Sequence, residues 1–181
     1  MKTFFLIAFA IFFTASSNAQ FQTANLTAAG LTCAMCTKAI HNSLQKLPVV
    51  EKVDADIKNS EFILTFKKDA VVDPDLLKKA VEDAGFSVSK LKLTGDFNDV
   101  KVNNDTHIQL GGKTYHFIKI KDKVLSGTQS ITIVDKNYVS SKEFKKILAS
   151  TDHPCVETGK AGECCERLGT ARNARIYHVT L

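Results

Sequence analysis

The sequence has no long hydrophobic run, and this absence limits what the chain can be. Its longest unbroken apolar stretch is Phe4 to Phe13, which is ten residues long. A helix needs about 20 apolar residues to cross the hydrocarbon core of a bilayer. The stretch is therefore too short for a permanent membrane anchor, and no later segment comes close. We expect no stable membrane insertion of the mature protein.

The sequence also lacks a block of arginines and any repeated alternation of basic and aromatic residues. The formal net charge is +5 at pH 7, but lysines are interleaved with aspartates and glutamates along most of the chain. Nucleic-acid-binding domains concentrate their positive charge in a patch or a stripe. We therefore interpret the mild basicity as a solvated surface and expect no nucleic-acid partner.

The first 19 residues have the pattern of an export signal. Lys2 gives a positive start, the apolar run follows, and Ser17-Asn18-Ala19 places small residues where a signal peptidase cleaves. No cysteine stands at the cleavage site, which argues against a lipid anchor. We expect a signal peptide over residues 1–19 and a soluble mature protein from about Gln20, periplasmic or secreted.

The sequence contains five cysteines, an odd number, so at least one of them stays outside an intramolecular disulfide. Two of them form the motif Cys33-Ala34-Met35-Cys36, which follows Gly30 and opens an amphipathic segment. Cysteines at this spacing direct both sulfurs toward one small centre, and the positive end of a helix favours their thiolate form. Two thiolates select copper(I), zinc or another soft ion over magnesium or calcium.

The same cysteine spacing occurs in thiol–disulfide redox pairs, so the surroundings have to distinguish the two interpretations. A thioredoxin-like pair lies in a different order of elements and usually has tryptophan and proline nearby. This sequence has no tryptophan. We therefore interpret Cys33 and Cys36 as metal ligands, with a redox or structural disulfide as the alternative.

Six elements are predicted around the motif. Alternating apolar residues predict strands, and apolar residues at helical spacing predict helices. In chain order these are a strand at 22–31, a helix at 36–47, strands at 49–57 and 61–66, a helix at 74–84 and a strand at 86–93. Asp73 caps the second helix, Pro74 takes its first position and Gly85 closes it. The order is that of a ferredoxin-like α+β unit, in which two helices cover one face of an antiparallel sheet.

These residues resemble the heavy-metal-associated domain of copper chaperones, copper-pumping P-type ATPases and the periplasmic mercury scavenger. The family loop is usually Gly-Met-Thr-Cys-x-x-Cys, and residues 30–36 match it except that Leu31 replaces the methionine, a packing residue of similar volume. Residues 82–86, Glu-Asp-Ala-Gly-Phe, match the end of the family's last helix and its aromatic residue beside the metal. The resemblance covers residues 24–93. It implies a metal site at Cys33 and Cys36 that exchanges its ion with a partner protein.

Residues 94–181 show no family resemblance. Thr94-Gly95-Asp96 is interpreted as a boundary, which divides the mature chain into domains at 20–93 and 94–181. Strands are expected at 100–102, 106–110, 113–120, 130–134 and 175–181, and a helix capped by Ser140 and Glu143 is expected before the last of them. This order favours a small, mainly-β domain of unknown function, possibly an OB-type barrel by analogy of element order.

The other three cysteines, Cys155, Cys164 and Cys165, fall in a loop expected at 152–165. We expect a disulfide from Cys155 to one of the other two, because exported cysteines oxidise by default and adjacent cysteines pair poorly. The alternative is a second soft-metal site, which the remaining thiol would form with His153 or His178.

The sequence thus predicts an exported soft-metal-binding protein. We expect it to bind copper(I) between Cys33 and Cys36, with mercury or zinc as the alternative ions, and to exchange the ion with a metal-donating or metal-accepting protein. No nucleophile, base and orienting group assemble elsewhere, so no enzymatic activity is expected. Three alternatives stay open: a scavenger of mercury or another toxic soft metal, a thiol–disulfide oxidoreductase, and a metal-sensing or partner-binding module.

Overall fold

The computed structural model describes residues 20–31, 33–166 and 170–181, apart from the side chains of Cys164 and Glu166. The predicted signal peptide lies outside this part. In chain order the elements are β1 (Phe21–Ala29), α1 (Ala34–Gln45), β2 (Val50–Asp56), β3 (Glu61–Phe66), α2 (Pro74–Asp83), β4 (Ser87–Val102), β5 (His107–Leu110), β6 (Lys113–Phe117), β7 (Lys123–Ile133), α3 (Ser141–Leu148), α4 (Cys155–Thr158), α5 (Glu163–Glu166) and β8 (Ile176–Thr180). Among the described residues, no helix is long and apolar enough to cross a membrane.

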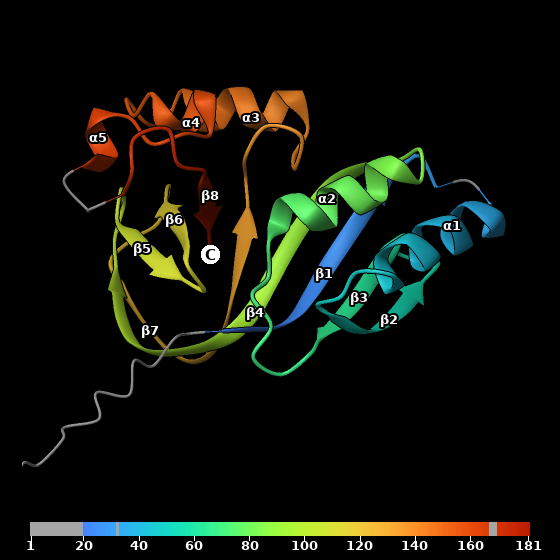
Figure 1. Cartoon of the computed structure of the whole chain (residues 1–181). Coiled ribbons are helices and arrows are strands. Elements are labelled where there is room, and N and C mark those ends of the chain that lie inside the picture. Colours follow the sequence, from blue (N-terminus) through green and yellow to red (C-terminus); the bar gives the residue numbers. More distant parts are fainter. Residues whose placement is uncertain (1–19, 32, 167–169) are drawn as a thin grey trace, which may run out of the picture.

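The first half of the chain folds into the predicted ferredoxin-like unit. Strand β1 pairs antiparallel with both β3 and β4, and β2 pairs antiparallel with β3. Helices α1 and α2 lie on one face of these strands (Figure 1). Helix α2 begins as predicted, because the carboxylate of its N-cap residue Asp73 accepts a hydrogen bond from the Asp75 backbone N–H at 3.0 Å. Gly85 follows the last turn with a φ of +88°, a conformation that costs glycine little.

The core of this unit is the one that the apolar spacing predicts. Five side chains that alternate along strands or recur along helices are fully buried: Leu26, Ile40, Leu44, Leu64 and Val81. They come from β1, α1, β3 and α2, so the two helices pack on the sheet through an apolar core. The fold of this unit therefore does not need a metal ion at its core.

The predicted boundary at Thr94-Gly95-Asp96 falls inside a strand. Strand β4 runs without interruption from Ser87 to Val102 and belongs to one sheet with the order β2-β3-β1-β4-β7-β8-β6-β5. Gly95 stands where the chain crosses the start of β1, and a Cβ atom there would collide with the Gln20 carbonyl group. The glycine thus serves a close backbone approach and not a linker. Independent folding of residues 20–93 and 94–181 stays a prediction.

The second half is mainly β, as expected, but the OB-type barrel is not confirmed. Its strands extend the sheet of the first half, with β6 and β8 parallel and the other pairs antiparallel. Helix α3 has the predicted cap, in which the Ser140 hydroxyl accepts a hydrogen bond from the Glu143 N–H at 3.3 Å. The loop expected at 152–165 contains two short helices, α4 and α5, which sequence periodicity misses because each has only four residues.

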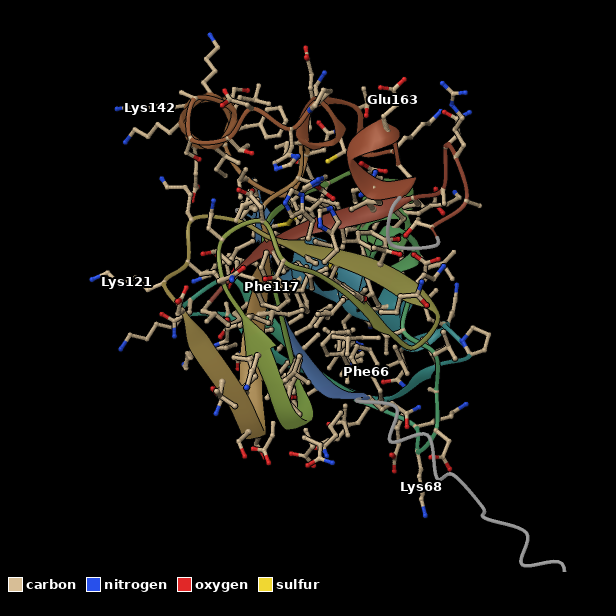
Figure 2. All side chains as sticks on the ribbon, turned by 90° about the vertical axis from the view of Figure 1, so that its left-hand side faces the viewer. Phe66, Lys68, Phe117, Lys121, Lys142 and Glu163 are labelled. Atoms are coloured by element: carbon tan, nitrogen blue, oxygen red, sulfur yellow. A yellow bond between two sulfur atoms is a disulfide. The ribbon has the colours of Figure 1, made fainter. Side chains whose placement is uncertain are left out.

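Helices α3, α4 and α5 lie together along one end of the second half (Figure 1). A small apolar cluster joins these helices to the sheet and includes Ile118, Ile147 and Ile176. A larger core runs through both halves of the sheet without a break at β4. Figure 2 shows two of its members, Phe66 and Phe117, inside the molecule.

Candidate functional site

The two cysteines of the motif lie at the start of α1. Cys33 is the N-cap residue, and its sulfur accepts a hydrogen bond from the backbone N–H of Cys36 at 3.2 Å. The two Cα atoms are 5.3 Å apart, and the sulfurs are joined in a disulfide. An N–H directed at a sulfur and the positive end of the helix both favour the thiolate once this bond is reduced. The sulfurs of Cys33 and Cys36, two potential ligands for a soft metal ion, therefore lie next to each other at the start of α1.

The cysteine loop is backed by the core on one side and open to solvent on the other. Cys33 is exposed and Cys36 is half-buried. Leu31 and Phe86 pack against the hydrophobic core, as expected for the residue beneath the loop and the aromatic residue beside it. Met35 does not pack, since 73% of its side chain is exposed. An incoming molecule therefore reaches the pair from the side of Cys33 and Met35.

A second group of nitrogen and sulfur ligands lies where β5, β6 and β8 meet α4 and α5. The strand register aligns three histidines across adjacent strands, because His107 pairs with His116 and His116 pairs with His178. The rings of His107 and His116 are stacked with centroids 3.9 Å apart. The His178 ring centroid lies 5.1 Å from that of His116. Neighbouring strands thus present a row of imidazoles on one face of the sheet.

Two cysteines from the short helices complete this group. The Cys155 sulfur, in α4, lies 3.7 Å from Nδ1 of His116. The Cys165 sulfur, in α5, lies 3.5 Å from Nε2 of His107. His107, His116 and Cys155 each offer one ligand atom, and these three atoms all lie within 4.8 Å of one another. All four side chains are buried or half-buried.

The environment keeps the two central imidazoles neutral. Burial lowers the pKa of His116 to about 2, and the positive charges that His107 and the other histidines would carry lower it further. Burial also lowers the pKa of His107 below its ordinary value. A neutral imidazole has a nitrogen lone pair to offer, which a protonated one does not.

The sequence predicts only part of this group. Its alternative second site places His153 or His178 beside a thiol, and His153 lies near the group, with its Nε2 3.5 Å from the Asp105 carboxylate. The residues in contact with the sulfurs are His116, which its place on a strand suggests is a structural histidine, and His107, for which the sequence makes no prediction. The predicted disulfide from Cys155 to Cys164 or Cys165 stays a prediction, because the Cys164 side chain lies outside the described part.

A polar network joins the start of α2 to the second half. Asp73 accepts hydrogen bonds from the Lys113 ammonium and from the Tyr177 hydroxyl, each at 2.6 Å. Asp75 accepts a hydrogen bond from Nε of Arg175 at 2.8 Å. These five side chains form hydrogen bonds within the network, so we interpret it as a structural junction between the two halves of the chain.

The network predicts a loss of stability in acid. Burial raises the pKa of Asp73, but hydrogen bonds from Lys113 and Tyr177 outweigh it, and the pKa ends below its ordinary value of 3.8. The same balance lowers the pKa of Asp75, with Arg175 as the main partner. A carboxylate whose pKa is lowered by folding stabilises the protein above its unfolded pKa, and this contribution is lost as the pH falls through the folded value. We expect the Tm to drop below about pH 4.

Circular dichroism of thermal unfolding between pH 7 and pH 2 measures this effect. An Asp73→Asn/Asp75→Asn variant should be less stable at pH 7 and should lose less stability on acidification. If wild type and variant fell equally with pH, the two carboxylates would not be the groups responsible.

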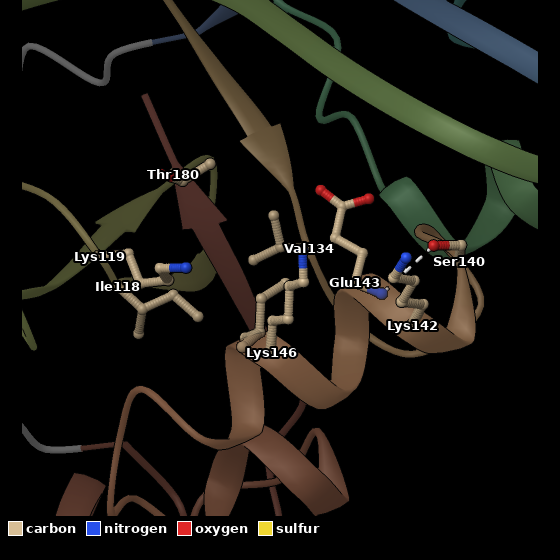
Figure 3. Close-up of a pocket in the computed structure, with 9 residues that line it drawn as sticks. Ile118, Lys119, Val134, Ser140, Lys142, Glu143, Lys146 and Thr180 are labelled. Atoms are coloured by element: carbon tan, nitrogen blue, oxygen red, sulfur yellow. Dashed lines mark hydrogen bonds between the residues drawn. The ribbon is translucent and has the colours of Figure 1, made fainter.

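A pocket of about 490 Å³ beside α3 is a third candidate (Figure 3). Ile118, Val134 and Ile147 form part of its wall, and Lys119 and Lys146 line it. The described residues that line it include no cysteine or histidine. It is therefore a basic surface pocket without ligands for a soft metal.

Comparison with known proteins finds a family model and several relatives that each match part of the chain. A family model described as the heavy-metal-associated domain matches residues 26–87. The periplasmic component of the mercuric transport protein from Acinetobacter calcoaceticus is 35% identical over 89 residues, which cover 49% of this chain and 97% of that protein. Its counterpart from Pseudomonas fluorescens is 37% identical over 68 residues, covering 38% of this chain and 74% of that protein.

Among solved structures, the crystal structure of oxidized MerP from Ralstonia metallidurans CH34 is 33% identical in sequence. It matches with a TM-score of 0.35 and covers 39% of this chain and 96% of that one.

Proposed function

The chain belongs to the heavy-metal-associated domain family, and from this we propose that it binds one soft metal ion between Cys33 and Cys36 and passes it to a partner protein. The observation that carries the proposal is the adjacency of the two sulfurs at an exposed helix start, with 5.3 Å between the Cα atoms. Two thiolates there can hold an ion that prefers few, soft ligands.

The proposed mechanism is ligand exchange and not catalysis. Two electrons and two protons first convert the disulfide into two thiols, which lose their protons as they bind the ion. A thiolate of the partner then bonds to the ion from the open side of the loop. Exposed Cys33 leaves first, and half-buried Cys36, held within the helix, leaves last. The ion is bound throughout and is never released into solvent.

The names of the relatives favour mercury(II) as the ion, because both are components of mercuric transport proteins. Copper(I), the ion expected from the sequence, is the second candidate. It is favoured by Met35, whose largely exposed side chain places a thioether in the loop, and thioethers select copper(I). A Met35→Leu variant should bind copper(I) more weakly if this thioether is a ligand, and unchanged copper(I) affinity would remove the argument from Met35.

We also propose that the protein works outside the cytoplasm. The relatives are named as periplasmic components, and residues 1–19 have the pattern of an export signal. An oxidising compartment maintains the Cys33–Cys36 disulfide unless a thiol reductant opens it. Metal loading is then controlled by the redox state of this one bond.

The dependence of metal loading on the redox state of the Cys33–Cys36 bond provides a test of the proposed function. In the mature protein, one equivalent of mercury(II) or copper(I) should shift the NMR amide signals of residues 33–40 only after a reductant has opened the disulfide. Peptide mapping of the same samples establishes whether the bond is intact. Equal shifts in a sample with an intact Cys33–Cys36 bond would contradict the thiolate mechanism.

A further inference from the structure

Four of the five histidines gather at one place in the second half of the molecule, while the fifth, His41, binds the Val53 carbonyl oxygen in the first half. Figure 2 looks onto this edge of the sheet, where α5, labelled at Glu163, lies above the strands. The proposed function uses none of these histidines. Two buried sulfurs lie among them, so the group combines the two ligand types that borderline metal ions prefer.

The distances between these ligand atoms match a tetrahedral metal site. Zinc binds cysteine sulfur at about 2.3 Å and histidine nitrogen at about 2.0 Å, which places neighbouring nitrogen and sulfur ligands about 3.5 Å apart. The observed separations are 3.7 Å between Cys155 Sγ and His116 Nδ1, and 3.5 Å between Cys165 Sγ and His107 Nε2. Cys155, His116 and His107 already lie within 4.8 Å of one another, and Cys165 lies beside His107. The two stacked rings would have to tilt toward each other to direct both lone pairs at one ion.

Each of the two imidazole rings, His107 and His116, has a hydrogen-bond partner on the side away from the sulfurs. The nitrogen that faces the sulfur therefore keeps its lone pair for a metal ion. Nδ1 of His107 lies 3.0 Å from the Asp105 carbonyl oxygen, so this nitrogen carries the proton and Nε2 keeps its lone pair. Nε2 of His116 lies 3.3 Å from the Asp105 carboxylate, which leaves the lone pair on Nδ1 beside Cys155. A carboxylate or carbonyl behind the imidazole is the usual second shell of a metal-binding histidine.

In the described part of the chain, a polar atom without a partner lies in the same region, on His178, which is separate from these four ligand residues. Nδ1 of His178 lies 2.6 Å from the Asp135 carboxylate, and this contact assigns its proton. Its Nε2 is buried and has no hydrogen-bond partner among the described residues. A buried acceptor without a partner is costly, and it is rare in native proteins unless water or an ion satisfies it.

We propose that His107, His116, Cys155 and Cys165 bind one zinc(II) ion. All four ligands come from the protein and are enclosed, so no position is left for a substrate, as in structural zinc sites. The ion would tie β5 and β6, at the edge of the sheet, to α4 and α5. It would thus stabilise the second half, in contrast to the exposed Cys33–Cys36 pair, whose ion is exchanged.

The test uses cobalt(II) as a spectroscopic probe in the mature Cys33→Ser/Cys36→Ser chain, kept under reducing conditions. The first site cannot contribute thiolates in this variant. We expect one cobalt(II) per chain, with a thiolate-to-cobalt charge-transfer band and the intense visible bands of tetrahedral coordination, all abolished by zinc. Absence of the charge-transfer band would overturn the proposal.

Further substitutions in the same background assign the ligands. Cys155→Ser and Cys165→Ser should each lower zinc affinity more than about 100-fold, and Asp105→Asn, which acts behind His116, by about 10- to 100-fold. Cys164→Ser is the matched control and should leave the band unchanged. If the two ligand variants fail to fold, the Asp105→Asn and Cys164→Ser results decide. Loss of the band in Cys164→Ser, or full affinity in Asp105→Asn, would contradict the assignment.

Discussion

Replacing Cys33 or Cys36 with serine is expected to lower the affinity of the mature protein for a soft metal ion more than about 100-fold. Removing a group that only supports a metal ligand already costs 10- to 100-fold, and these substitutions remove a ligand itself. A serine hydroxyl is a hard, neutral oxygen and replaces a thiolate poorly for mercury(II) or copper(I). The double variant should lose binding at this site altogether.

Competition titrations followed through the amide signals of residues 33–40 measure this loss at the loop itself, apart from any other thiol. The fold should survive, because the core side chains of this unit pack without the cysteines. Ala34→Ser is the matched control, since it adds a hydroxyl to the same loop and keeps both thiols. Stoichiometric binding at the loop in the double serine variant would show that other residues hold the ion.

Replacing Arg175 with methionine is expected to lower the free energy of unfolding by about 2–3 kcal/mol. The guanidinium donates to Asp75 at 2.8 Å and to Asp135 at 2.7 Å, and it lies 4.2 Å from the centre of the Tyr177 ring. Breaking a buried ion pair costs about 3–5 kcal/mol because the partner charge stays buried. Asp135 is 5% exposed, but the Asp75 side chain is 40% exposed, so solvent screens part of this cost.

For a chain of this length the loss corresponds to a Tm lower by roughly 5–10 °C. Urea and thermal unfolding of the reduced protein measure it. Lys121→Met is the matched control, because it removes one positive charge from an exposed side chain that points outward in Figure 2 and should change stability by less than about 0.5 kcal/mol. Equal losses in the two variants would contradict a specific role of Arg175 at the junction.

The first half could be predicted from the sequence because its signals are local. Asp73, Pro74 and Gly85 mark the ends of α2 through bonds and angles that involve only near neighbours. The alternation of Ala24, Leu26 and Ala28 fixes the buried face of β1, and all three are buried. Local patterns of this kind determine the elements, and the order of the elements then indicates the ferredoxin-like unit.

The course of the chain after Leu93 could not be predicted in the same way. A glycine between polar residues indicates a turn, yet Gly95 continues β4, paired with Phe21 and Gln129, and the backbone of Gln20 lies too close to it for a side chain. That contact joins positions far apart in the sequence, so no local pattern reveals it. The boundary predicted at residues 94–96 falls on Gly95, whose role depends on the tertiary fold.

The full set of residues in the histidine and cysteine group could not be predicted from the sequence for the same reason. His116 and His178 become neighbours only through the parallel pairing of β6 with β8, and β7 and the three short helices lie between these strands in the chain. The alternation of residues along a strand indicates which side chains share one face of the sheet. It does not indicate which strand lies beside that strand. The sulfurs of Cys155 and Cys165 reach the group from helices too short to show periodicity.

The central claim, that Cys33 and Cys36 hold the transferred ion, is tested most directly by thiol footprinting. The reduced mature protein is loaded with one equivalent of mercury(II), treated with an alkylating reagent and mapped by mass spectrometry. We predict that Cys33 and Cys36, which are accessible in the metal-free protein, become protected together, and that adding a competing dithiol restores their reactivity. Alkylation of both cysteines at the rate seen without metal would contradict the account.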